Sequence, residues 1–128
     1  MKIEKPKIST MRKNRITLFM WAEIMKEKYP ELEMLFAVPF DAYKSVSSCK
    51  KFTEEGLKKG IPDVCLPISN GKFSSLWIKI KSSKHTKLTE KQKWWIKELN
   101  AKGCLAVDCV GWEAARDIIL NYLNASKD

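Results

Sequence analysis

The chain has 128 residues, of which 45% are hydrophobic, and this length and composition fit one domain that can bury its own core. Its 24 lysines and arginines outnumber its 15 acidic residues, so the net charge at pH 7 is +9. Such an excess points to a polyanionic partner, and no lipidation motif or long basic amphipathic helix favours a membrane surface over nucleic acid. The sequence contains no signal peptide and no run of about 18 apolar residues, so we expect an intracellular protein without a membrane span.

The cysteines read as reduced thiols rather than zinc ligands. No pair has the C-x-x-C spacing of a zinc site, and only one histidine is present. Three of the four lie in apolar, strand-like runs, where a free cysteine behaves as a small hydrophobic side chain. The four are Cys49, Cys65, Cys104 and Cys109.

The N-terminal part of the chain reads as an arm, a helix and a strand. Residues 1–12 are basic and without periodicity, so we expect a solvated arm there, with phosphate contact as the alternative. Apolar residues recur at helical spacing over residues 14–29, and Pro30 ends that pattern. Residues 34–38 then predict a short buried strand.

A polar segment and a short helix follow. Residues 41–51 are polar and basic and predict a loop, in which Lys50 and Lys51 are candidate contacts to nucleic acid. Residues 48–59 predict a short helix with Gly60 as its C-cap. Glu54 and Glu55 on this helix are interpreted as a solvated face, with a contribution to a metal site as the alternative.

A β-hairpin over residues 60–84 is the centre of the predicted fold. Two short apolar runs, residues 64–66 and 76–78, flank an Asn70-Gly71 pair that is typical of a tight primed turn. Pro62 marks the strand entry, so Asp63 lies at the mouth of the first strand.

The second strand of this hairpin separates charged from apolar side chains. Because strand residues alternate between faces, Lys79 and Lys81 leave one face and Ile78 and Ile80 the other. A carboxylate and two ammonium groups thus converge at one end of the hairpin. The Lys79 ammonium could pair directly with Asp63, and burial would favour that pairing.

The rest of the chain predicts a loop, two helices and a strand. Residues 82–87 form a basic loop that holds the only histidine, His85. Thr89 and Gln92 make a capping box for a helix that Gly103 ends, with Trp94 and Trp95 in its buried face. A strand over residues 105–110 and an amphipathic helix over 112–123 complete an α/β fold, a small mixed β-sheet flanked by helices.

Three motifs in this order resemble a known nuclease family. Gly60-Ile61-Pro62-Asp63, the hairpin ending in Ile78-Lys79-Ile80-Lys81, and Gln92 on the next helix are similar to the core of the PD-(D/E)XK nucleases. Within that superfamily they look most like the stand-alone VRR-NUC (virus-type replication-repair nuclease) domains of phages. The resemblance runs from about Leu18 to the last helix, and it implies a restriction-endonuclease-like core and one nuclease domain over residues 13–128.

The resemblance also implies a function and a set of site residues. It implies an endonuclease that uses Mg²⁺ or Mn²⁺ to hydrolyse branched DNA such as four-way junctions (Holliday junctions), as a homodimer in the cytoplasm of the phage host. In the family pattern Asp63, the residue at position 79 and the Ile80 carbonyl hold the metal. Lys81 orients the attacking water, and Gln92 positions water or nucleic acid. Further expected contacts to nucleic acid come from the loop residues Lys84, His85 and Lys87.

The sequence departs from the family pattern at two places, and Lys79 is expected to leave this chain inactive or impaired as a nuclease. The family has Glu or Asp where this chain has Lys79, and it usually carries a further acid near the start of the first helix, where residues 12–22 contain none. Three explanations follow. Lys79 is a single substitution that disables an otherwise intact nuclease, which we favour; or the chain is an inactive relative kept for DNA binding; or Glu54 or Glu55 replaces the lost ligand. The rival functions are a non-catalytic DNA-binding module and a basic domain that binds a protein partner.

Overall fold

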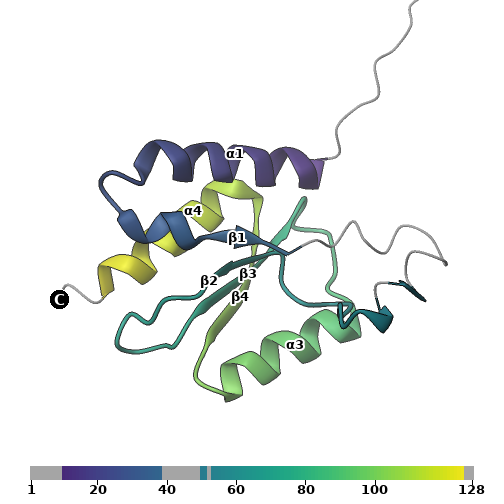
Figure 1. The fold of residues 1–128 in the computed structure, drawn as a ribbon. Helices are drawn as coiled ribbons and strands as arrows, with labels where there is room; N and C mark the ends of the chain where they lie inside the picture. The colour runs from purple at the N-terminus through teal and green to yellow at the C-terminus, as the bar shows by residue number, and fades with distance from the viewer. Residues whose placement is uncertain (1–9, 39–49, 52, 126–128) are drawn as a thin grey trace, which may run out of the picture.

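The computed structural model describes residues 10–38, 50–51 and 53–125 as a mixed sheet covered by helices on both faces (Figure 1). Helices α1 and α4 cover one face of the sheet, and α3 covers the other. The elements are α1 (Thr10–Met25), a 3-10 turn η1 (Pro30–Met34), β1 (Phe36–Ala37), β2 (Val64–Leu66), β3 (Leu76–Lys81), α3 (Glu90–Ala101), β4 (Leu105–Val110) and α4 (Gly111–Asn124). The predicted α/β class is therefore confirmed.

The sheet has the strand order β1-β2-β3-β4 in the described part of the chain. β2 pairs antiparallel with β3, with Val64 opposite Ile78, so the predicted hairpin is present. β3 pairs parallel with β4, with Lys79 opposite Asp108, and α3 is the crossover between these two strands. β3 is thus a central strand whose two faces are both covered.

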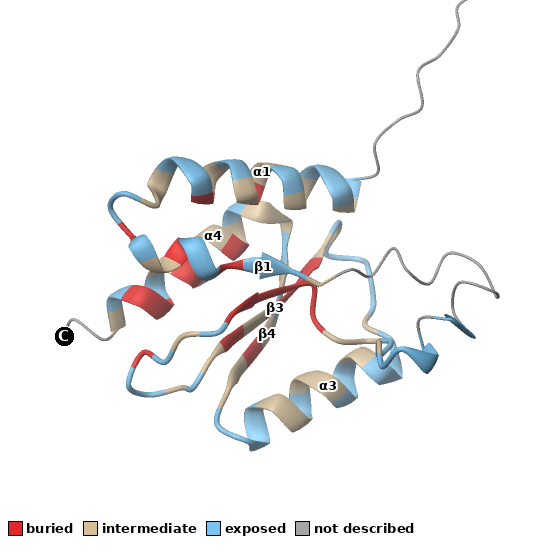
Figure 2. Ribbon diagram, viewed as in Figure 1, coloured by how far each residue is buried: buried red, intermediate tan, exposed pale blue. Residues whose placement is uncertain are grey.

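The hydrophobic core lies on the α1 and α4 side of the sheet (Figure 2). Ile78 and Ile80 of β3 are buried there with Leu18 of α1 and Ile119 of α4. Because side chains alternate along a strand, this burial turns Lys79 and Lys81 to the opposite face. The expected division of β3 into an apolar and a charged face is what the fold shows.

The N-terminal elements differ from the prediction in their bounds. α1 begins at Thr10 rather than at residue 14, so residues 10–12 belong to the helix, and the rest of the predicted arm lies outside the described residues. The buried strand predicted over residues 34–38 is wrong: β1 has two residues and both are exposed. β1 pairs with β2 alone, and an edge strand buries less of its side chains than a central one.

The connection between β2 and β3 is not the primed turn that Asn70-Gly71 predicted. Both primed turn types need a positive φ at the first central residue, and in the described residues only glycines have one. Asn70 is instead buried, and its Oδ1 accepts hydrogen bonds from the amides of Lys72 (2.9 Å) and Phe73 (2.8 Å). Its Nδ2 donates to the Tyr122 carbonyl at 3.1 Å, which fastens the long connection to α4.

The predicted C-cap at Gly60 is also wrong. The described helical residues of this region end at Glu54, and Gly56 follows with φ +96 and an amide bond to the Thr53 carbonyl at 3.1 Å. Gly60 has φ +87 and packs against Lys91 of α3, because a Cβ at Gly60 would lie 2.8 Å from the Lys91 carbonyl carbon. The predicted loop residues 41–49 lie outside the described part. Within the described residues, no helix is long and apolar enough to cross a membrane.

Candidate active site

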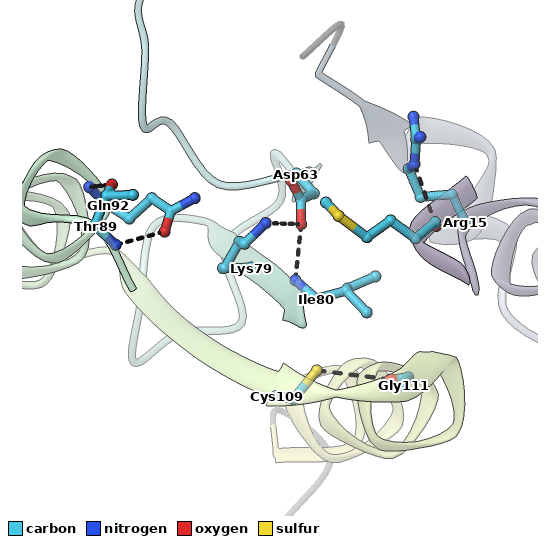
Figure 3. A network of polar contacts seen from close by, with 9 residues as sticks. Arg15, Asp63, Lys79, Ile80, Thr89, Gln92, Cys109 and Gly111 are labelled. Carbon is cyan, nitrogen blue, oxygen red and sulfur yellow. Dashed lines mark hydrogen bonds and ion pairs between the residues drawn. The ribbon is translucent and has the colours of Figure 1, made fainter. Parts of the chain in front are cut away.

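Asp63, the residue directly before β2, lies beside Lys79 of β3 (Figure 3). Asp63 is 4% exposed, and its Oδ2 accepts a hydrogen bond from the Ile80 amide at 2.8 Å. The Lys79 Nζ lies 3.3 Å from the same Oδ2, and the Lys79 side chain is also buried. The direct pairing suggested by the sequence is therefore present, and it is a buried ion pair.

The surroundings of Asp63 act on its pKa in opposite directions. Burial raises the pKa of Asp63, because desolvation penalises the charged carboxylate. The Lys79 ammonium, the Ile80 amide and the Arg15 guanidinium lower the same pKa without offsetting burial fully, so it remains above its usual value. The neighbouring cations thus favour the charged form of Asp63, which burial disfavours.

Lys81 is engaged by an acidic residue that the sequence analysis did not single out. Its Nζ lies 3.1 Å from Oδ2 of Asp108 on β4, in the strand register that also places Asp108 opposite Lys79. Only the parallel pairing of β3 with β4 brings these residues together. The available signal was that Asp108 interrupts the otherwise apolar run of residues 105–110.

Gln92 forms the capping box predicted for the start of α3. Its side-chain Oε1 accepts a hydrogen bond from the Thr89 backbone amide at 2.9 Å, and the Gln92 backbone amide donates to Thr89 Oγ1 at 3.2 Å. The structural role of Gln92 is confirmed. Its role towards water or nucleic acid stays a prediction.

Arg15 of α1 is the second site residue that the sequence analysis missed. Its positive charge is the smallest of the influences that lower the pKa of Asp63, and its Nε donates a hydrogen bond to the Met11 carbonyl within α1 at 3.5 Å. The family resemblance implies an acid near this part of the first helix. Cations from two elements, Lys79 of β3 and Arg15 of α1, therefore act electrostatically on one buried carboxylate, and Lys79 also contacts it.

The described residues do not fit a Mg²⁺ or Mn²⁺ ion. Hard divalent cations need carboxylate oxygens, usually one or two with further oxygen ligands. Here the buried carboxylate of Asp63 is held by a lysine ammonium, and no group of three or more His, Cys, Asp or Glu side chains is gathered in the described part of the chain. Neither Glu54 nor Glu55 joins Asp63 in such a group, and both are exposed.

The predicted contacts to nucleic acid all lie on the surface. Lys84, His85 and Lys87 are exposed in the segment that leads from β3 to α3, directly after Lys81. Lys50 and Lys51 are exposed as well. These residues are placed where a polyanion could reach them.

Comparison with known proteins supports the family resemblance. No family model and no curated protein matches the sequence. Among solved structures, one described as a "VRR_NUC domain protein" is 26% identical, with a TM-score of 0.78, and the match covers 94% of this chain and 93% of that one. The resemblance carried by the Gly-x-Pro-Asp and Lys79-x-Lys81 motifs is thereby confirmed, and this chain has the nuclease fold of a VRR-NUC domain.

Proposed function

We propose that this chain is a structure-specific DNA endonuclease domain in which Lys79 suppresses metal-dependent cleavage. In this proposal it binds branched DNA such as four-way junctions and hydrolyses phosphodiester bonds poorly or not at all. The VRR-NUC fold and the net charge of +9 support the DNA partner. The observation that carries the proposal is the buried Lys79–Asp63 ion pair at the centre of the site.

The effect of Lys79 follows from electrostatics. A lysine in place of a glutamate changes the charge beside Asp63 by two units and removes an oxygen ligand at the same time. A divalent cation would meet an ammonium 3.3 Å from the carboxylate that should bind it. Repulsion between like charges is strong at such a buried position, because little solvent screens it. Binding of Mg²⁺ or Mn²⁺ is therefore expected to be weak in this chain.

The test compares this chain with its Lys79→Glu variant on a labelled four-way junction, with Mg²⁺ or Mn²⁺. We expect cleavage by the variant and little or none by the parent chain. Lys79→Gln is the matched control, because it removes the ammonium without supplying a carboxylate ligand. Lys79→Glu combined with Asp63→Asn should be inactive. Equal cleavage by the parent chain and Lys79→Glu would overturn the proposed role of Lys79.

A second candidate is a non-catalytic DNA-binding module on the same fold. The observation that favours it is Arg15, whose charge also acts on Asp63, so that restoring one acid leaves a second cation near the site. On this interpretation Lys79→Glu binds the junction and does not cut it, even in combination with Arg15→Glu. Cleavage by either variant would exclude it.

The proposed enzyme acts as a homodimer in the cytoplasm of a phage host, with one protomer for each of two paired strands. The measurement for the assembly is the mass of the protein in solution, by light scattering, with and without a junction. A monomer in both conditions would remove the homodimer from the proposal. The DNA-binding part of the proposal would be unaffected by that result.

A further inference from the structure

Helix α3 carries an exposed tryptophan that was expected in its buried face. Trp94 is 49% exposed, and no residue of α3 is fully buried. The exposed ring lies in a shallow groove lined by Trp94 and four charged side chains, Glu90, Lys91, Lys93 and Lys97. None of these residues belongs to the site around Asp63.

The neighbouring tryptophan has a different role. Trp95 is partly buried, and its Nε1 donates a hydrogen bond to the Lys59 carbonyl at 3.0 Å, which ties α3 to the segment before β2. The ring of Trp94 meets that of Trp95 edge-on, with centroids 5.4 Å apart and planes at 85°. Trp95 thus supports Trp94 from the side. An exposed indole braced in this way is ordered before any ligand arrives, which lowers the entropic cost of binding.

The charges around Trp94 favour an anionic ligand. Three lysines line the groove against one acid, Glu90, which pairs with Lys93 at 3.5 Å. The Lys91 Nζ lies over the Trp94 ring, 5.3 Å from its centroid. A single aromatic ring among lysines offers too little apolar area for a protein interface, but it suits a ligand that combines a flat ring with negative charge.

We propose that Trp94 is a stacking platform for an unpaired base of DNA, with Lys91, Lys93 and Lys97 contacting the phosphates beside that base. This inference rests on the proposed function and adds the kind of DNA feature that the domain recognises. Every base presents a π face, so stacking on Trp94 would be tolerant of sequence. The Lys91 ammonium is flexible enough to leave the ring and follow the phosphate as the base stacks.

The groove lies on the helix whose first turn contacts the segment leading to the candidate active site. Trp94 is two residues from Gln92, at the end of α3 that packs on Gly60 and so on the segment leading to Asp63. A strand whose unpaired base stacked on Trp94 would therefore run near that site. Branched DNA that carries a single-stranded arm supplies such a base next to a duplex.

The experiment measures the affinity of the full chain for three labelled DNAs by fluorescence anisotropy: a blunt duplex, a fully paired four-way junction and a fork with one single-stranded arm. We expect Trp94→Ala to weaken binding of the fork by about tenfold. Binding of the blunt duplex should change by less than about twofold, because its bases are all stacked already. Trp94→Phe should keep most of the affinity for the fork, since it retains an aromatic face.

Met20→Ala is the matched control, because Met20 is an exposed apolar side chain of α1, on the other side of the sheet (Figure 1). It should leave all three affinities unchanged. A second readout is tryptophan emission: the chain has five tryptophans, and the part of the quenching that the fork causes through Trp94 should be lost in Trp94→Phe.

The outcomes separate this inference from the proposed function. If Trp94→Ala binds the fork as well as the parent chain does, or loses equal affinity for fork and blunt duplex, the stacking site is wrong while DNA binding stands. If the parent chain binds none of the three DNAs, the proposed function fails and this inference fails with it.

Discussion

At the scale of single residues, the candidate site contains a carboxylate whose charge is disfavoured by burial and a lysine whose opposite charge compensates for it. Asp63 is nearly inaccessible to water, yet the Ile80 amide and the Lys79 ammonium both contact its Oδ2. A buried ion pair gains little net stability, but removing one partner is costly because the other charge is left unpaired. Lys79 therefore has a structural role whatever its effect on catalysis.

The first prediction concerns the stability of Lys79→Met. Without the ammonium, the pKa of Asp63 should rise further, since Lys79 is a main influence that lowers it. A carboxyl group whose folded pKa exceeds its unfolded value costs stability above the folded pKa, and that cost is lost as pH falls through the folded pKa. We expect Lys79→Met to lower the free energy of unfolding by about 3 kcal/mol near pH 7.5, and by much less near pH 4.5.

Urea denaturation at the two pH values tests this prediction. Asp63→Asn combined with Lys79→Met is the control, because a neutral amide has no charge to desolvate. The stability that this double variant loses relative to the parent chain should differ little between the two pH values. A loss of stability in Lys79→Met that is equal at both pH values would mean that the Asp63 charge is not its cause.

The sequence predicted some site contacts and missed others for a physical reason. The Asp63–Lys79 pair could be foreseen, because both residues belong to one hairpin whose alternation is visible in the sequence. The ion pair of Lys81 with Asp108 and the electrostatic influence of Arg15 on Asp63 depend on how β4 and α1 pack against that hairpin. Such packing is not encoded by local periodicity, so these two partners became visible only in the folded chain.

At the scale of elements, helices followed the sequence more closely than loops and edges did. Capping at Thr89 and the stop at Gly103 are local, and both are present where expected. The Asn70-Gly71 signal failed because Asn70 makes a long-range bond to Tyr122, which competes with the local turn. The prediction of a buried strand over residues 34–38 was wrong because β1 is an edge strand, whose residues lack a neighbouring strand on one side.

The second prediction concerns the stability lost when alanine replaces either of two glycines with similar φ. It separates the cost of the left-handed backbone conformation from the cost of a steric clash. Gly60 and Gly103 have φ of +87 and +91, but a Cβ at Gly103 would meet nothing within 4 Å, while one at Gly60 would lie 2.8 Å from Lys91. Gly103→Ala should therefore cost about 1 kcal/mol, from the left-handed conformation alone. Gly60→Ala should cost at least about 1 kcal/mol more, from the clash with the α3 backbone.

Thermal unfolding of the two variants in parallel measures the difference. Because Gly60 fixes the segment before Asp63 against the start of α3, Gly60→Ala should also weaken junction binding, whereas Gly103→Ala should not. Equal destabilisation by both substitutions would show that the segment moves away from Lys91 at no cost.

At the scale of the whole molecule, one face of the sheet is closed by packed helices, and exposed basic residues gather near one end of β3. The core side of the sheet is closed by α1 and α4, while the segment after β3 and the start of α3 carry exposed basic residues next to the Asp63 site. A polyanion is therefore expected at one end of β3. The connection before β3, which carries Lys72, lies at the other end of the strand.

The third prediction is the salt dependence of junction binding. Each phosphate neutralised by a lysine contributes about −0.9 to the slope of log affinity against log salt on duplex DNA. Contacts from Lys50, Lys51, Lys84 and Lys87 would give a slope of about −3 to −4. The double variant Lys84→Ala, Lys87→Ala should lower the steepness by about 2, with weaker binding at every salt concentration.

Lys72→Ala, which removes an exposed lysine at the far end of β3, should leave the slope unchanged. If all three proteins share one slope, the anion-binding surface lies elsewhere, and the phosphate contacts assigned to the segment after β3 are wrong.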